Sequence, residues 1–120
     1  MQNQKRSITN LFDKNDPLTY LNARIGSGGE TYRGDYYASI SFASNRIYVE
    51  SGKKYMLVRK PVSETTILYN CWAFYTANMT FIKEDSSFIE KNIIQIPDGC
   101  TFVRFTGLIT DIDNAKFYEL

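Results

Sequence analysis

The feature that most constrains the fold lies at residues 93–107, which read IIQIPDGCTFVRFTG. Runs rich in β-branched and aromatic residues stand on both sides of a Pro-Asp-Gly turn, where proline fixes φ and glycine tolerates a positive φ. We therefore expect the chain to reverse here between two strands. Because side chains alternate along a strand, Val103 and Phe105 share one face, which we expect to be core. The other face mixes an aromatic ring, the guanidinium of Arg104 and a hydroxyl group, which favours a strand lining a wet, concave surface.

Short runs of the same kind recur along the chain. Aromatic residues make up 15% of it, and β-branched and aromatic residues favour strands. Turn-forming residues separate the runs, which is typical of a β-sandwich or barrel with roughly eight or nine short antiparallel strands and little helix. We expect Ile47 and Val49 to join the same core. The clearest runs lie at residues 38–42, 47–49, 55–59, 71–75, 93–96, 102–106 and 116–119, and weaker ones at residues 10–13, 64–69, 80–82 and 88–89.

Length and charge set further limits. A chain of 120 residues suffices for one domain around one core. We expect a polar leader or linker over residues 1–9 and a single β-sandwich domain over residues 10–120. The formal net charge is +1, with no basic run beyond Lys5 and Arg6, so we expect no nucleic-acid partner. The sequence indicates neither a secretory signal nor a membrane-spanning stretch, so we expect no membrane insertion.

Several kinds of catalytic site are excluded by residue type. The chain has no histidine, which removes Ser-His, Cys-His and His-based zinc chemistry. A glycosidase needs two carboxylates at fixed separation in a cleft, whereas the acidic residues lie in predicted turns. We therefore expect a protein that is not an enzyme and that needs no cofactor. Asp111 and Asp113 leave a structural calcium site as an alternative to plain turn chemistry. Cys71 and Cys100 lie in apolar strand-like sequence, where we expect buried free thiols.

Four segments, taken in order, resemble a known family. They are NLFD at residues 10–13, SNRIYVESGKKY at residues 44–55, AFY at residues 73–75 and IPDGCTFVRF at residues 96–105. Their order and spacing, over roughly residues 10–119, resemble the jelly-roll carbohydrate-binding modules of bacteriophage tail and receptor-binding proteins. The pair Cys71-Trp72 before the aromatic pair departs from the family pattern, which does not require it.

The resemblance implies a jelly-roll topology and non-catalytic adhesion to a host cell-surface glycan. It also implies a protein located in the virion tail, made in the host cytoplasm and assembled as a homo-oligomer within a larger tail structure. For a protein that is not phage-encoded, we expect an extracellular location.

A sugar site needs an aromatic ring against the apolar C–H face of the sugar, and charged groups that hydrogen-bond its hydroxyls. Residues 20–37 form a long, glycine-rich segment, and loops of that length are often functional. The expected carbohydrate-binding residues are Arg104, Arg59, Trp72, Tyr75, Tyr36, Tyr37 and Asp35.

Each of these candidates has a structural alternative. Trp72 shares a face with Phe74, so both rings fit the core as well as a sugar platform, and Tyr75 then takes the opposite role. Arg104 lies between core residues, where a salt bridge to a carboxylate such as Glu50 competes with a ligand contact. Arg59 fits a solvated rim charge, and residues 35–37 fit ordinary packing at the start of a strand.

Two other functions remain open beside glycan adhesion. One is a structural or assembly module of a virion that contacts neighbouring proteins. The other is the binding module of a secreted bacterial glycoside hydrolase. A concave face with exposed aromatic rings and arginine would favour sugar, whereas a broad apolar patch would favour protein contact.

Overall fold

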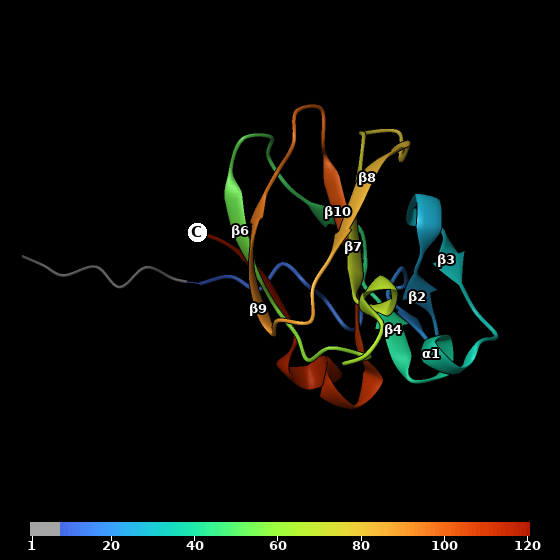
Figure 1. Cartoon of the computed structure of the whole chain (residues 1–120). Coiled ribbons are helices and arrows are strands. Elements are labelled where there is room, and N and C mark those ends of the chain that lie inside the picture. The colour runs from blue at the N-terminus through green and yellow to red at the C-terminus, as the bar shows by residue number, and fades with distance from the viewer. Residues whose placement is uncertain (1–7) are drawn as a thin grey trace, which may run out of the picture.

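The computed structural model describes residues 8–120, which form an all-β sandwich (Figure 1). Residues 1–7, which belong to the leader expected at residues 1–9, lie outside the described residues. Residues 8–120 contain eleven strands, so the expected eight or nine was too few; the extra ones are two-residue strands. The jelly-roll topology stays a prediction.

A six-stranded and a three-stranded sheet make the sandwich. The large sheet contains β1 (Tyr20–Leu21), β4 (Ser41–Ala43), β5 (Ile47–Tyr48), β7 (Cys71–Tyr75), β8 (Phe81–Ser86) and β10 (Phe102–Leu108). The small sheet contains β6 (Lys54–Val58), β9 (Lys91–Gln95) and β11 (Lys116–Glu119). All pairings are antiparallel, and β10 pairs with β4, β5 and β7. The strand expected to anchor the fold is therefore the central strand of the large sheet.

The main core lies between the two sheets. Ile47, Val49, Val103 and Phe105 are all buried in it, which confirms the alternation predicted for these strands. The small sheet contributes residues such as Phe117, whose ring stacks on that of Phe105. Burial of this apolar surface is the main term that stabilises the fold.

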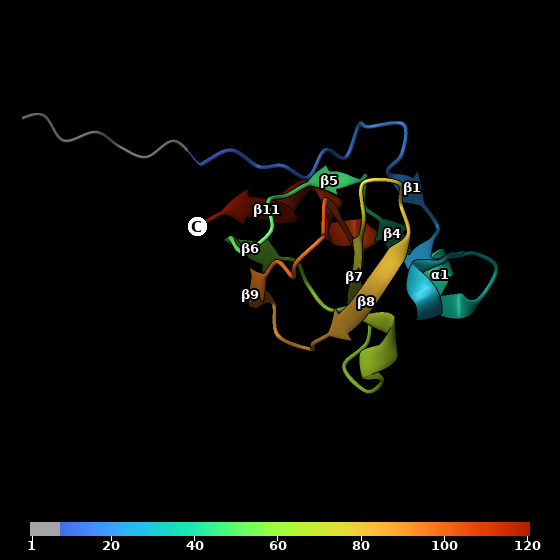
Figure 2. The same ribbon diagram turned by 90° about the horizontal axis from the view of Figure 1, so that it is seen from above.

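A third layer covers the outer face of the large sheet. It is a two-stranded ribbon of β2 (Arg24–Ile25) and β3 (Thr31–Tyr32), joined by the 3-10 helix η1 (Ser27–Gly29). Both views place α1 (Tyr36–Ser39), the helix next to the ribbon, on the side of the large sheet that faces away from β6 and β9 (Figures 1 and 2). The backbone N–H of Ile25 donates to the hydroxyl of Thr106, and the Cys71 thiol donates to the Ile25 carbonyl. The face of β10 expected to be wet and concave is therefore a second interior, which corrects that prediction.

Four segments differ from the expected secondary structure, and one of them, residues 88–89, forms no strand and lies in the connection between β8 and β9. Residues 36–39, which overlap the start of the strand expected at residues 38–42, form the short helix α1 (Tyr36–Ser39), because Asp35 caps it by accepting from the backbone N–H of Ala38 at 2.7 Å. Residues 10–13 form no strand; one backbone hydrogen bond, from Leu11 to Phe117, ties them to β11. Residues 64–69 form a loop that ends in the 3-10 helix η2 (Ile67–Tyr69). The last helix, η3 (Ile109–Asn114), precedes β11.

Candidate functional site

Arg59 is an internal brace rather than a ligand contact. Its side chain is 1% exposed, and its guanidinium donates to the carbonyls of Thr106 at 3.0 Å, Asn70 at 2.6 Å and Ile89 at 3.2 Å. Burial lowers the pKa of Arg59 to about 10. Because its nitrogens are already bonded to backbone carbonyls of β10 and of two loops, a sugar cannot reach them, and the prediction for Arg59 is corrected.

The two rings expected as sugar platforms are also buried. Trp72 is 6% exposed and packs in the main core together with Phe74. Tyr75 is 3% exposed on the opposite face of β7, where its hydroxyl donates to the Gly29 carbonyl at 2.7 Å. Burial raises the pKa of Tyr75. The ribbon layer covers one ring and the small sheet covers the other, so neither offers a face to a ligand.

Arg104 is buried and makes no salt bridge with any residue from 8 to 120. Its Nε donates to the Ser44 carbonyl at 3.2 Å, and its Nη1 donates to the hydroxyl of Thr31 at 2.9 Å. Glu50, the partner considered for it, pairs with Lys53 at 3.1 Å instead. The salt-bridge alternative is therefore wrong, and Arg104 lines a small cavity that is described below.

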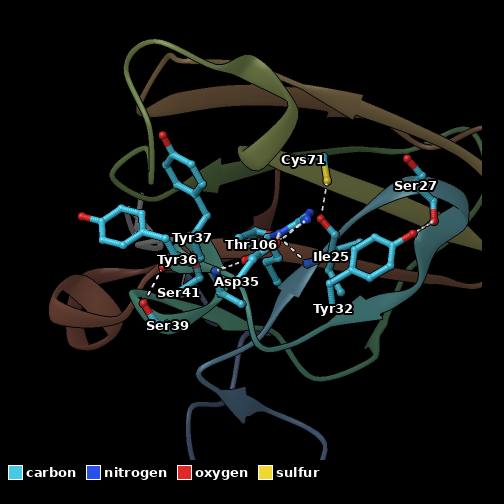
Figure 3. A network of polar contacts seen from close by, with 12 residues as sticks. Ile25, Ser27, Tyr32, Asp35, Tyr36, Tyr37, Ser39, Ser41, Cys71 and Thr106 are labelled. Atoms are coloured by element: carbon cyan, nitrogen blue, oxygen red, sulfur yellow. Dashed lines mark hydrogen bonds and ion pairs between the residues drawn. The ribbon is translucent and has the colours of Figure 1, made fainter.

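The three remaining candidates, Asp35, Tyr36 and Tyr37, come together beside the ribbon. Arg24 donates to one oxygen of Asp35 from Nε at 2.9 Å and from Nη2 at 2.7 Å. This bond from Arg24 is the main reason why the pKa of Asp35 lies below its usual value, and the bond from Ala38 adds to it. Figure 3 shows Asp35 inside this polar network, with Tyr36 and Tyr37 on one side and Tyr32 on the other.

Tyrosine rings surround the Arg24–Asp35 pair. The guanidinium carbon of Arg24 lies 4.8 Å from the ring centre of Tyr32 and 4.7 Å from that of Tyr69. Tyr37 stacks on Tyr69 with ring centres 3.8 Å apart, and Tyr36 meets Tyr37 edge-on. These are favourable cation–π and aromatic geometries, so β3, α1 and η2 are fixed to one another through side chains.

Glycine sets the position of the Tyr32 ring. A Cβ atom added at Gly26 would lie 1.9 Å from that ring. Because glycine has no side chain, the ring lies directly over the backbone of residue 26. The Tyr32 hydroxyl also donates to the Ser27 carbonyl at 3.3 Å.

A cleft of about 330 Å³ opens beside this ring. We call it the Arg24 cleft; it is lined by Arg24, Gly26, Ser27, Tyr32, Leu68, Glu84 and Ser86. Tyr32 is 36% exposed, and Glu84 accepts from the backbone N–H of Gly28 at 3.3 Å. The cleft thus combines one accessible aromatic ring with a cation, a carboxylate and two side-chain hydroxyls.

The cleft contains one acidic residue, Glu84, among its lining residues. Asp35, the nearby acid, is bonded to Arg24 and caps α1. The lining therefore offers one carboxylate, that of Glu84, as a hydrogen-bond acceptor.

Metal binding at Asp111 and Asp113 finds no support in their contacts. Asp111 accepts from the backbone N–H of Lys60 and from the side chain of Asn114, whereas Asp113 pairs with Lys14. Within residues 8–120, no group of three or more His, Cys, Asp or Glu side chains could hold a metal ion.

Sequence reasoning missed Arg24, Tyr32, Tyr69 and Glu84. A signal existed for the first two, since they flank the glycine-rich run at residues 26–29 inside a segment whose length indicated function. Tyr69 and Glu84 approach only through tertiary packing of η2 and β8, which no local pattern encodes.

No family model, curated protein or solved structure significantly matches this chain. In the part that the structure describes, no helix has the length and apolar character needed to cross a membrane.

Proposed function

We propose that the protein is a non-catalytic carbohydrate-binding module whose binding site is the Arg24 cleft. The observation that supports this most is the partly exposed Tyr32 ring, held over Gly26 and next to the Arg24 guanidinium. A sugar ring can stack its C–H face on such a ring while its hydroxyls bond to charged groups at the edge.

The remaining wall of the cleft supplies those groups. Glu84 accepts hydrogen bonds, and the hydroxyls of Ser27 and Ser86 both donate and accept. Arg24 is already oriented by Asp35, so little side-chain entropy is lost when a ligand binds there. The shallow site predicts weak binding per domain, on the order of micromolar to millimolar, which repetition in a multimer would strengthen.

The resemblance of the sequence to phage adhesion modules suggests the biological setting. We propose a host-surface polysaccharide as the ligand and a tail or receptor-binding protein as the parent; the binding module of a secreted glycoside hydrolase is the alternative parent. Both settings require the same chemistry of the cleft.

The test is a glycan and cell-wall polysaccharide array probed with the 120-residue chain, followed by calorimetry on the glycans that bind. Glu84→Gln should weaken binding about tenfold, which corresponds to roughly 1.4 kcal/mol. Asp85→Asn is the matched control, because the next residue of β8 points to the other face of the strand. Equal affinities of the two variants would exclude the cleft as the site.

An assembly role is favoured by a different surface. Phe88, Ile89 and Ile93 are 40%, 65% and 64% exposed in and just before β9. Such exposure is typical of contacts between proteins when the residues form one patch. Light scattering over a concentration series would detect self-association, and Ile93→Lys should abolish it if this surface is the interface.

A further inference from the structure

A second cavity lies on the opposite face of the ribbon from the Arg24 cleft. Its volume is about 120 Å³, and its lining residues are Leu18, Tyr20, Thr31, Arg46 and Arg104. Thr31 and Tyr32 are consecutive in β3, so their side chains point to opposite faces, one into each site. We call it the Arg104 cavity; it shares no lining residue with the Arg24 cleft.

Positive charge is concentrated around this cavity. Arg46 and Arg104 line it, and the guanidinium carbons of Arg33 and Arg104 lie 4.9 Å and 5.8 Å from the ring centre of Tyr20. None of these arginines forms an ion pair within residues 8–120, and residues 1–7 contain no acidic residue. Glu30, just before β3, is exposed and pairs with none of them.

Arg104 is the buried one of these three cations, and its guanidinium is incompletely bonded. It is 7% exposed, and its buried Nη2 has no hydrogen-bond partner within residues 8–120, although the guanidinium lies close enough to the Tyr75 hydroxyl to act on the pKa of that group. Nε and Nη1 bond only to neutral oxygens. A buried charge is costly unless a counter-charge or a full set of hydrogen bonds compensates it. The bonds to Ser44 and Thr31 fix the orientation of the guanidinium, so the cavity is prepared for a group of opposite charge.

We propose that the Arg104 cavity binds a single oxyanion group, namely a carboxylate, sulfate or phosphate. Guanidinium groups match the oxygen geometry of these anions, and such charge-assisted bonds are stronger than neutral ones. The volume fits one such group but not a saccharide chain. The oxyanion is either free or carried as a substituent on an acidic saccharide. The inference goes beyond the proposed function, because the cavity would bind the anion even if the Arg24 cleft bound no sugar.

The experiment is a titration followed by NMR on the arginine Nε–H signals. Sodium sulfate, sodium phosphate and sodium glucuronate are the probes, with glucose and sodium chloride at matched ionic strength as references. Saturable shifts of Arg104 Nε–H with any of the oxyanions, and none with glucose or chloride, support the site. Absence of saturation with all three oxyanions overturns it.

Variants distinguish binding in the Arg104 cavity from a general attraction of anions to positive charge on the protein. Arg46→Ala and Arg33→Ala change exposed side chains and should leave the fold intact, yet weaken oxyanion binding by about tenfold. Lys91→Ala removes the same charge from an exposed position in β9, on the small sheet, and should change the affinity less than about twofold. Equal weakening by Lys91→Ala and Arg46→Ala would overturn the proposal.

The same titration identifies the source of the oxyanion. Glucuronate that binds more tightly than sulfate and phosphate indicates an acidic saccharide, and the reverse order indicates a free inorganic anion; either result supports an oxyanion site. Glu84→Gln should leave oxyanion binding unchanged, so failure of the cleft proposal and failure of this one give different results.

Discussion

Arg59 and Arg104 are both buried arginines that have no carboxylate partner in the described part of the chain, but their surroundings differ. The guanidinium of Arg59 donates from each of its nitrogens to backbone carbonyls, and it is closed off by the loops around β6 and β7. The guanidinium of Arg104 has two partners, one nitrogen without any, and a cavity beside it. Burial alone therefore does not distinguish a structural arginine from one that binds a ligand. The number of acceptors that the protein supplies to the guanidinium distinguishes them.

The largest expected effect concerns Arg59. Arg59→Met should lower the free energy of unfolding by about 3–5 kcal/mol, because buried carbonyls of Thr106 and Asn70 lose their donor. Urea denaturation followed by circular dichroism measures the change. Arg46→Met, at an exposed position, is the control and should stay within about 0.5 kcal/mol. A loss below about 1 kcal/mol for Arg59→Met would mean that the brace is dispensable.

Arg104→Met should cost less. Only the Ser44 carbonyl and the Thr31 hydroxyl lose a partner, and an uncompensated charge disappears, so we expect a loss of about 1–2 kcal/mol in the same assay. If Arg104→Met proved as damaging as Arg59→Met, both arginines would be structural and the contrast between them would fail.

Added sulfate should stabilise the folded protein through the Arg104 cavity and not through Arg59. At ten times its dissociation constant, sulfate should raise the unfolding free energy of the wild type by about 1.4 kcal/mol. Arg104→Met should abolish this gain, whereas Arg59→Lys should retain it because Arg59 lies outside the cavity. Chloride at equal ionic strength controls for screening. A sulfate effect that survives in Arg104→Met would place the anion elsewhere.

The smallest expected effect measures how far water is excluded from the thiol of Cys71, which lies in the region beside Arg59. Burial raises the pKa of Cys71 to about 12, whereas the thiol of the unfolded chain ionises near pH 9.0. Above that pH the unfolded state releases a proton that the folded state keeps, so stability should fall as pH rises, by at most about 1.4 kcal/mol per pH unit. Urea midpoints between about pH 8 and pH 9 measure the slope, because the Arg59 guanidinium, with a pKa of about 10, loses its proton above this range and would then oppose the effect of the thiol.

Cys71→Ala should flatten this slope. Cys100→Ala added to it should flatten the slope further, because burial also raises the pKa of Cys100. Both thiols are free and buried, as the sequence predicted. Identical slopes in Cys71→Ala and the wild type would show that the thiol is hydrated in the folded state.

The sandwich core could be predicted from the sequence, and the reason is physical. Alternation in β10 and β5 reports one buried face, which identified Val103, Phe105, Ile47 and Val49. The same alternation could not reveal that the ribbon covers the other face of β10. A two-residue strand such as β2 has no periodicity to detect, and its contact with Thr106 spans 81 residues of sequence.

The candidate site was only partly predictable. Asp35, Tyr36 and Tyr37 do lie together beside a cleft, but their partner Arg24 is joined to them by a side-chain ion pair. We expected accessible side chains at Arg59, Trp72 and Tyr75 because their residue types suit sugar binding. Residue type, however, does not indicate which layer of the fold covers a side chain. The Arg104 cavity likewise arises from packing between β1, β3 and β10.

The ribbon layer lines the candidate binding sites, whereas the two sheets supply most of the hydrophobic core, and this affects how such a protein can diversify. Residues 26–36, which include η1, β3 and Tyr32, contribute no side chain to either hydrophobic core. Replacements in this segment can therefore alter what is bound while the stabilising residues stay as they are. Gly26, Gly29 and Asp35 are the exceptions, because a Cβ atom at either glycine would clash with a neighbouring aromatic ring and because Asp35 caps α1. The exposed positions of the segment, such as Tyr32, can vary in evolution or in a library while the scaffold stays constant.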